Sequence, residues 1–144
     1  MLYAVLCYHH EAEVMGWTPA QDEAVLAKRA KVQQKIAAAG KLGPVARLMP
    51  TTAATTVRSG REPVVIDGPF AETKELIAGY WIIQAKSMAE AIAWATRAPN
   101  PSGNEESEIE IRQFFEMEDF APSPAVERAF ELGKDLAKTK KQAQ

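Results

Sequence analysis

The sequence Asp67-Gly68-Pro69-Phe70-Ala71-Glu72-Thr73-Lys74-Glu75 lies between two apolar runs, residues 64–66 and 77–83. Glycine tolerates a positive φ, and proline fixes φ and lacks an N–H, so Asp-Gly-Pro predicts a rigid corner between two strands. Polar side chains then follow before the second strand begins. Their density beside a rigid turn makes this nine-residue segment, which we name the Asp67 corner, the first candidate for a binding site.

The segments on both sides of the Asp67 corner have the composition of strands. Residues 51–58 are rich in threonine and valine, Ser59-Gly60 is a turn signal, and residues 63–66 follow as a hairpin partner. Residues 78–85 combine aromatic and β-branched side chains. We therefore expect a hairpin, the corner and then a buried strand.

A capping-box pattern marks the start of the first helix. Thr18 is a suitable N-cap, Pro19 suits the first helical position, and Gln21 completes the box. Gly40 is a typical residue after a helix end. The apolar stripe of this helix is formed by Val25, Val32, Ile36 and Ala39.

Strands are expected on both sides of this helix. Residues 2–8 are a continuous apolar run, which is typical of a strand buried on both faces. Residues 11–16 are predicted to form a loop. After the helix, residues 43–49 predict a second strand.

The C-terminal half adds two helices and a strand. Ser87 and Glu90 form a second capping box that opens a helix over residues 88–97. Residues 108–117 alternate apolar and charged side chains, which predicts a strand with one polar face. A final helix begins at Ser123. The polar face of the strand carries Glu108, Glu110, Arg112 and Glu116.

The order of these elements predicts an α+β fold of the ferredoxin-like, split βαβ kind, with helices on one face of an antiparallel sheet. The other face of the first strand then needs cover, and a second copy of the chain, packed sheet to sheet about a two-fold axis, would supply it. We expect one ferredoxin-like domain over residues 1–120. Residues 121–144 would form a helical extension with a frayed end.

Length and composition are those of a soluble globular protein. The chain has 144 residues, enough to bury a sizeable core in one domain, with 47% hydrophobic and 25% charged residues. Its net charge of −2 offers no concentrated basic face for nucleic acid or an anionic membrane. We expect no direct nucleic-acid binding and no membrane association.

Cysteine content and the apolar runs indicate a cytoplasmic protein. Cys7 is the only cysteine, so no internal disulfide can form, and its apolar neighbours predict a small buried side chain. The N-terminal run lacks a basic lead, and His9-His10-Glu11 follows it where a signal peptide would have small residues. No apolar run approaches the roughly 20 residues that span a bilayer.

The Asp67 corner resembles the DGPF signature of the YCII-related domain family. The resemblance rests on Asp67-Gly68-Pro69-Phe70, on the polar segment that follows it, and on Gly79 before a strand. Thr55-Thr56-Val57-Arg58 before the signature and residues 89–95 after it add support. The resemblance covers residues 1–112 and leaves the last helix outside.

This resemblance implies a ferredoxin-like fold that dimerises as an α/β barrel. In relatives, a His at a helix start and an Asp that face a cleft have been proposed to act in catalysis. Some DGPF proteins accompany, or are fused to, extracytoplasmic-function sigma factors. The YCII branch typically opens its first helix with Arg-Pro-x-His, but Thr18-Pro19-Ala20-Gln21 stands here. Gln21 cannot act as a general acid or base, so it is a candidate for ligand binding only.

His9-His10-Glu11, together with Glu13, has the donor types of a divalent-metal site. Adjacent strand residues point to opposite faces, so the two histidines would not share one ion, and we predict no metal. Either both are partly exposed strand-end residues, or one faces a cleft and acts as general acid or base near neutral pH.

The polar residues of the Asp67 corner have two interpretations each. Asp67 either accepts hydrogen bonds from the backbone of its own turn or orients an imidazole or a substrate hydroxyl. Glu72, Lys74 and Glu75 either form a solvated charged face or bind a ligand, with Lys74 receiving an anionic group.

The remaining polar and aromatic candidates lie outside the corner. Arg112 either receives a carboxylate or phosphate bidentately or pairs near Glu110 across the sheet. Trp17, Trp81 and Trp94 are expected to be core or interface anchors. The sequence has no dinucleotide glycine fingerprint, phosphate loop, serine nucleophile elbow or Cys-x-x-Cys site, so we predict no cofactor.

Two functions of different classes stay open. The first is a small-molecule site at the cleft of a homodimer, which either performs acid–base catalysis or only binds. The second is a non-catalytic regulatory or interaction protein, for example a sigma-factor partner, whose terminal helix presents Phe130 and Leu136. The candidate catalytic residues are Asp67, His9 and His10, and the ligand-binding candidates are Gln21, Glu72, Lys74, Glu75 and Arg112.

Overall fold

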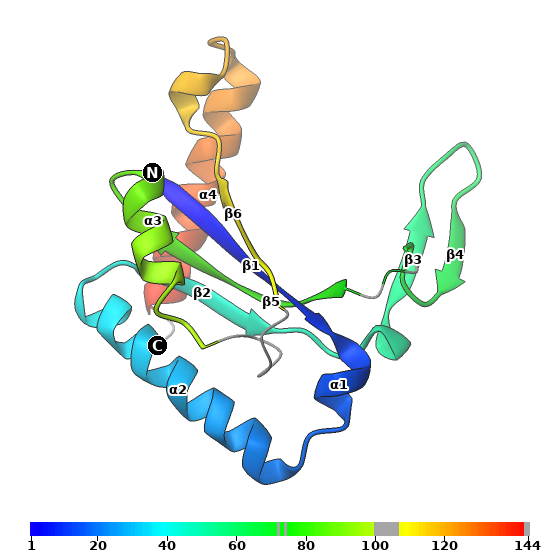
Figure 1. Cartoon of the computed structure of the whole chain (residues 1–144). Helices are drawn as coiled ribbons and strands as arrows, with labels where there is room; N and C mark the ends of the chain where they lie inside the picture. The colour runs from blue at the N-terminus through cyan, green and yellow to red at the C-terminus, as the bar shows by residue number, and fades with distance from the viewer. Residues whose placement is uncertain (72, 74, 100–106, 143–144) are drawn as a thin grey trace. The chain divides into compact units, whose positions relative to one another are not determined.

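The computed structural model describes residues 1–71, 73, 75–99 and 107–142 (Figure 1). The chain divides into two compact units, Met1–Gln113 and Phe114–Gln144. Within the described residues, the first unit holds a four-stranded and a two-stranded sheet. The domain boundary expected between residues 120 and 121 stays a prediction.

The four-stranded sheet is antiparallel and has the strand order β2-β5-β1-β6. Val5 of β1 lies opposite Trp81 of β5 on one side and opposite Ile111 of β6 on the other. The first strand of the chain is therefore internal to the sheet, as its continuous apolar run predicts. The strands are β1 (Leu2–His10), β2 (Leu42–Arg47), β5 (Glu75–Gln84) and β6 (Ile109–Gln113).

Two helices, α2 (Pro19–Ala38) and α3 (Met88–Ala95), cover one face of this sheet (Figure 1). In the core beneath them, the Trp81 indole N–H donates a hydrogen bond to Cys7 Sγ over 3.1 Å. Burial raises the pKa of the Cys7 thiol. The buried cluster consists of Tyr3, Val5, Cys7, Ile36, Trp81, Ile83, Ala85, Ala91 and Ala95.

The opposite face of the sheet, directed away from α2 and α3, mixes apolar and charged side chains. The Tyr8 hydroxyl donates to Glu110 Oε2 over 3.0 Å, and Arg112 Nε lies 3.6 Å from Glu110 Oε1. The polar face predicted for the last strand is confirmed for residues 109–113. This opposite face carries Ala4, Leu6, Tyr8, Tyr80, Ile82, Glu110 and Arg112.

The helix ends follow the predicted capping. The Thr18 hydroxyl accepts the Gln21 backbone N–H over 3.3 Å, and the Gln21 side-chain oxygen accepts the Thr18 backbone N–H over 2.9 Å. Gly40 follows α2 with a φ of 68°. At the start of α3, the Ser87 hydroxyl accepts the Glu90 backbone N–H over 3.3 Å.

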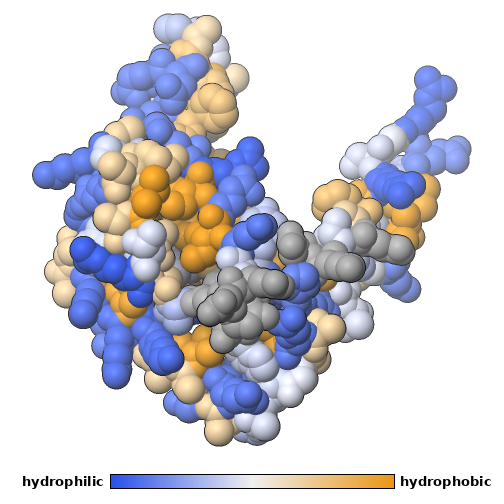
Figure 2. Space-filling view, viewed as in Figure 1, coloured by the Kyte–Doolittle hydropathy of each residue, from blue (hydrophilic) through white to orange (hydrophobic). Residues whose placement is uncertain are grey.

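A two-stranded hairpin is inserted between β2 and β5. It consists of β3 (Thr55–Arg58) and β4 (Val64–Asp67), and a 3-10 turn, η1 (Thr51–Ala53), precedes it. Gly68 follows with a φ of 101°, the left-handed value that favours glycine at the corner. Figure 2 displays hydrophobic residues on this hairpin. Its exposed apolar side chains are Val57, Val64, Val65 and Ile66.

The segment expected to be a loop over residues 11–16 forms a short helix, α1 (Glu11–Met15). The Glu11 carboxylate accepts hydrogen bonds from the backbone N–H and the hydroxyl of Thr51, each over 3.1 Å. Acidic side chains in a first turn also suit the helix dipole. The prediction was wrong because this tertiary contact has no local sequence signal.

The strand expected over residues 108–117 is shorter than predicted. β6 ends at Gln113, which lies opposite Tyr3, and β1 begins only one residue before that, at Leu2. An antiparallel strand ends where its neighbour offers no further backbone partners. Residues beyond β6 instead form a 3-10 helix, η2 (Met117–Asp119).

The second unit contains η2 and the terminal helix α4 (Pro124–Gln142), so the predicted last helix is confirmed. The ring centroids of Phe115 and Phe120 are 5.3 Å apart, and those of Phe120 and Phe130 are 5.9 Å apart. These tilted and edge-on contacts form a small aromatic cluster at the start of the helix.

The elements together make an α+β fold whose antiparallel sheet and helices are compatible with a ferredoxin-like arrangement. Both sheets are open within the described part of the chain, and no closed barrel is present there. In the same residues, no helix is long and apolar enough to cross a membrane.

Candidate functional site

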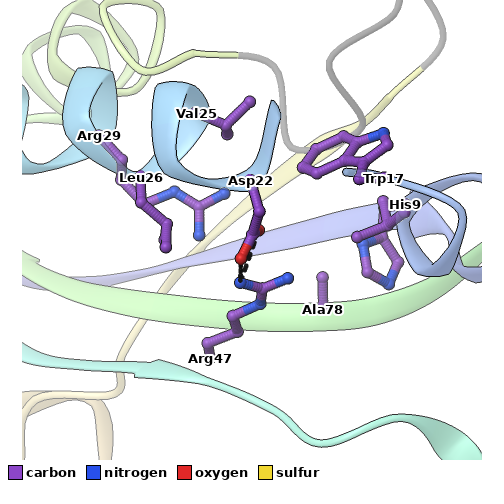
Figure 3. A pocket seen from close by; sticks show the side chains of 9 residues that line it. His9, Trp17, Asp22, Val25, Leu26, Arg29, Arg47 and Ala78 are labelled. Carbon is purple, nitrogen blue, oxygen red and sulfur yellow. Dashed lines mark hydrogen bonds and ion pairs between the residues drawn. The ribbon is translucent and has the colours of Figure 1, made fainter. Parts of the chain in front are cut away.

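A small pocket lies at the carboxyl end of β1, on the face of the sheet that α2 covers (Figure 3). We name it the β1 pocket. Its volume is about 280 Å³ with the open mouth included. It is lined by His9, Val14, Trp17, Asp22, Val25, Leu26, Arg29, Arg47 and Ala78.

Three elements bring the polar side chains of the β1 pocket together. Asp22 and Arg29 are seven residues apart on α2, which is two helical turns, so they share one face. His9 lies on β1, two residues after Cys7 and directed to the same face of the sheet. Arg47 is the last residue of β2.

A glycine holds the strand that carries Arg47 close to its neighbour. Arg47 lies opposite Gly79 of β5 in the sheet register. A Cβ atom at Gly79 would overlap the carbonyl oxygen of Ala46 and come within 3.2 Å of Arg47 Cα. Glycine is therefore needed at this position for the close backbone approach that places Arg47 in the pocket.

An ion pair closes one side of the β1 pocket. Arg47 Nη1 lies 2.9 Å from Asp22 Oδ1 and 3.1 Å from Asp22 Oδ2 (Figure 3). The two side chains are 45% and 36% exposed, so solvent screens the pair and we expect it to contribute only about 0–1 kcal/mol. Its main effect is to set the position of Arg47.

Arg29 has no such partner. Its side chain is half-buried and directed from α2 into the pocket (Figure 3). Among the residues that the structure describes, it forms no hydrogen bond or ion pair. Burial lowers the pKa of its guanidinium. The Asp22 carboxylate in the same pocket opposes this effect, but it is bound by Arg47, so a half-buried Arg29 guanidinium without a hydrogen-bonded anion would gain free energy from an incoming one.

His9 is the imidazole of the β1 pocket. Burial lowers its pKa, and Arg47 and Arg29 lower it further, whereas Glu11 acts in the opposite direction. The imidazole is therefore neutral at pH 7, with one nitrogen that can donate and one that can accept a hydrogen bond. A neutral imidazole can take a proton from a molecule bound beside it.

His10 lines a different and wider pocket around α1. This α1 pocket is also lined by Glu11, whose carboxylate is held by Thr51, and His10 has interactions of its own. Within the described ranges, no group of three or more His, Cys, Asp or Glu side chains could hold a metal ion. The two histidines thus line separate pockets. The α1 pocket is lined by His10, Glu11, Ala12, Glu13, Met15, Thr51, Thr73 and Leu76.

Asp67 lines neither pocket. It ends β4 with an exposed side chain, and its carboxylate forms no hydrogen bond with the residues that the structure describes. Other groups close the corner: the Gly68 N–H donates to the Ala54 carbonyl oxygen, and the Thr56 hydroxyl donates to the Gly68 carbonyl oxygen, each over 2.7 Å. Asp67 therefore shares a pocket with neither histidine.

The other corner candidates are only partly described. Glu72 and Lys74 lie outside the described residues. Glu75 begins β5, where its backbone lies opposite His10 of β1. Thr73 of the same segment lines the α1 pocket, so the corner approaches that pocket and not the β1 pocket.

The two remaining ligand-binding candidates have structural partners. The Gln21 side-chain oxygen accepts hydrogen bonds from the backbone N–H and the hydroxyl of Thr18, which engages it in the cap of α2. Arg112 lies on the opposite face of the sheet beside Glu110. Neither side chain lines the β1 pocket.

Asp22, Arg29 and Arg47 are not among the residues predicted from sequence. One signal was present for Arg29, which falls between Val25 and Val32 at helical spacing and so lies in the apolar stripe of α2. A charged residue in a core-facing stripe is rare unless it is paired or functional. For Arg47, the placement depends on strand pairing, which the local sequence does not reveal.

Two comparisons found known sequences to which this chain is similar. The model of the YCII-related domain matches residues 1–117 of this chain. An uncharacterized protein, R00369, from Rhizobium meliloti (strain 1021) is 52% identical over 101 residues, which is 69% of this chain and 82% of that protein. The expected family is thereby confirmed: the chain belongs to the YCII-related domain family.

Proposed function

We propose that this protein binds a small molecule in the β1 pocket and that His9 exchanges a proton with it there. The observation that carries the proposal is the placement of His9 and the partner-less Arg29 in one pocket, as far as the described residues extend. Titratable groups with shifted pKa values in a cleft are typical of functional sites.

The choice of His9 as the proton-exchanging group follows from what surrounds it. Gln21 stands at the start of α2, and its amide cannot exchange a proton. The Asp22 carboxylate is engaged by Arg47. His9 is left as the lining group whose neutral imidazole can exchange a proton with a bound molecule, so it is the candidate acid or base.

A thermal-shift screen of the full chain against metabolites and metal ions tests the binding proposal, because a ligand of the folded state raises the unfolding midpoint. The variant Val25→Phe fills the β1 pocket from α2 and should abolish the shift. The matched variant Ala27→Phe adds the same ring at an exposed position of α2 outside the pocket and should retain it. A hit that survives Val25→Phe would place binding elsewhere.

Dimerisation is the second part of this proposal: the opposite face of the four-stranded sheet would pack on a second copy and complete a dimeric α/β barrel. Apolar Leu6 and Ile82 on that face, beside the Tyr8–Glu110 hydrogen bond, support it. Light scattering should give twice the chain mass, and Ile82→Lys should give the monomer. A monomeric wild-type protein at micromolar concentration would contradict the dimer.

One observation favours the alternative, a non-catalytic interaction protein. Leu132 and Leu136 lie one helical turn apart on α4 and are 62% and 58% exposed. An apolar pair on a helix face suits docking to a partner such as an extracytoplasmic-function sigma factor. Co-purification with that sigma factor, lost in a Leu132→Ser, Leu136→Ser variant, would support this function; independence from both leucines would contradict it.

A further inference from the structure

We propose that the ligand of the β1 pocket is a small monocarboxylate with an apolar body, whose carboxylate binds the Arg29 guanidinium beside Arg47. The inference rests on the proposed function, because it names the class of molecule that the same pocket would take. Its evidence is the charge, the shape and the one carboxylate already present in the pocket.

The charge of the lining selects a monoanion. Arg29 and Arg47 each contribute +1, Asp22 contributes −1, and His9 is neutral, so the sum is +1. One carboxylate on the ligand neutralises that charge. A dianion would leave the pocket with net negative charge among half-buried groups, which is unfavourable.

The Asp22 carboxylate is an internal example of the expected contact. Arg47 Nη1 binds both of its oxygens, at 2.9 Å and 3.1 Å. That contact uses one nitrogen of Arg47, whereas a whole guanidinium fork offers two parallel N–H groups that match both oxygens of a carboxylate. Arg29 offers such a fork from the face of α2 that also carries Asp22. No described residue forms a hydrogen bond or an ion pair with it. A ligand carboxylate at Arg29 would therefore repeat a contact that this pocket already makes.

The rest of the lining selects the body of the ligand. Val14, Val25, Leu26 and Ala78 are apolar, and Trp17 adds a half-buried indole beside His9 (Figure 3). An aromatic ring offers a large apolar surface with little loss of side-chain freedom. Most of the 280 Å³ is open to solvent at the mouth, so the enclosed part is small and the body of a ligand would lie largely in the mouth. The body is thus a short alkyl chain or one ring.

Isothermal titration calorimetry on the full chain, at constant ionic strength, tests this class with matched probes. Benzoate and butyrate should bind saturably. Benzamide and butyramide have nearly the same shape without the charge, and we expect them to bind at least about tenfold more weakly, because charge-assisted hydrogen bonds are lost. Inorganic phosphate should bind more weakly than either carboxylate.

Substitutions in α2 separate charge recognition from structural damage. Arg29→Met should weaken benzoate binding roughly 10- to 100-fold, and Arg29→Lys, which retains the charge without the fork, should lie between. Lys28→Met removes the same charge from the adjacent exposed position and should leave binding within about twofold. Asp22→Asn should tighten binding, because the lining charge rises from +1 to +2.

The outcomes distinguish this inference from the proposed function. Equal binding of acids and amides, or binding of phosphate in place of the carboxylates, would overturn the ligand class but retain a ligand in the pocket. Weaker binding by Asp22→Asn would overturn the role assigned to the lining charge. If no probe binds and the metabolite screen also gives no hit, both the class and the proposed function fail.

Discussion

The β1 pocket and the Asp67 corner both hold charged side chains, but they hold them in different ways. In the corner, Asp67 is exposed and the backbone of Gly68 makes the contacts that fix the turn. In the pocket, Arg29 is half-buried among apolar side chains and His9 has a lowered pKa. The charged residues of the corner are neighbours in the sequence. Those of the pocket come from three separate elements and are neighbours only in the folded chain.

A local density of polar residues is therefore weaker evidence for a binding site than one charged side chain in an apolar setting. Exposed charges are solvated, so they interact weakly with one another and need no further partner. A guanidinium withdrawn from water gains much more from an anion. The two regions should therefore respond differently to substitution.

The largest expected effect is at Gly79, which supports the pocket. Gly79→Ala would force a Cβ into the Ala46 carbonyl oxygen and push β2, with Arg47, away from β5. We expect the free energy of unfolding to fall by about 1–3 kcal/mol, as for other overpacked sites. Chemical denaturation measures it. An unchanged midpoint would show that β2 does not approach β5 as closely as described.

The matching substitution in the corner, Gly68→Ala, should have a smaller and local effect. Gly68 has a φ of 101°, which strains any other residue by roughly 1–2 kcal/mol. No atom lies within 4 Å of its added Cβ, so only the backbone is affected. Amide hydrogen exchange should speed up in β3 and β4 while β1 and β5 stay protected. Faster exchange across the four-stranded sheet would contradict the separation of the regions.

The titration of His9 gives a further test of desolvation in the pocket. The pKa of His9 in the folded protein is below 6.5, the ordinary value that it takes in the unfolded chain. At a pH between these two pKa values, the unfolded chain therefore binds more protons than the folded protein. The stability linked to His9 is therefore complete above about pH 6.5 and is lost as the pH falls through the folded pKa. His9→Asn should flatten the stability profile over this range, measured by denaturation at several pH values. His10→Asn should retain the slope, and a slope that survives His9→Asn would contradict the assignment.

The smallest expected effect comes from a surface pair outside both regions. Lys41 is bound to Glu90 and, with the Lys86 backbone N–H, lowers the pKa of Glu90 to about 2. The pair stabilises the fold above about pH 4.5, and its contribution is lost as the pH falls toward 2. In Lys41→Met the pKa of Glu90, measured by NMR, should rise toward 4.5, and the stabilisation that the pair gives above pH 4.5 should shrink with it. An unchanged pKa would exclude Lys41 as the cause.

Much of the fold was predictable from local patterns. The capping box at Thr18 and Gln21, the helix end at Gly40 and the hairpin before the corner all have short-range causes, and all are present. The length of β6 and the helix α1 were not predictable, because the first depends on where β1 begins and the second on the contact between Glu11 and Thr51.

The candidate site was less predictable than the fold. His9 could be proposed from its place at the end of a strand. That His9 and not His10 lines the β1 pocket depends on the face of the sheet to which each side chain is directed. Asp22 and Arg47 meet only after α2 packs on the sheet. Arg29 could have been found from sequence, since a charge between Val25 and Val32 interrupts an apolar stripe.

One titration compares the two regions directly: a ¹H–¹⁵N NMR experiment in which benzoate is added to the full chain. The Arg29 side-chain Nε–Hε and the Trp17 indole N–H signals should shift saturably, while the backbone amides of Asp67 and Gly68 stay in place. Saturable shifts at the corner, with unchanged Arg29 and Trp17 signals, would contradict the assignment of the β1 pocket as the binding site.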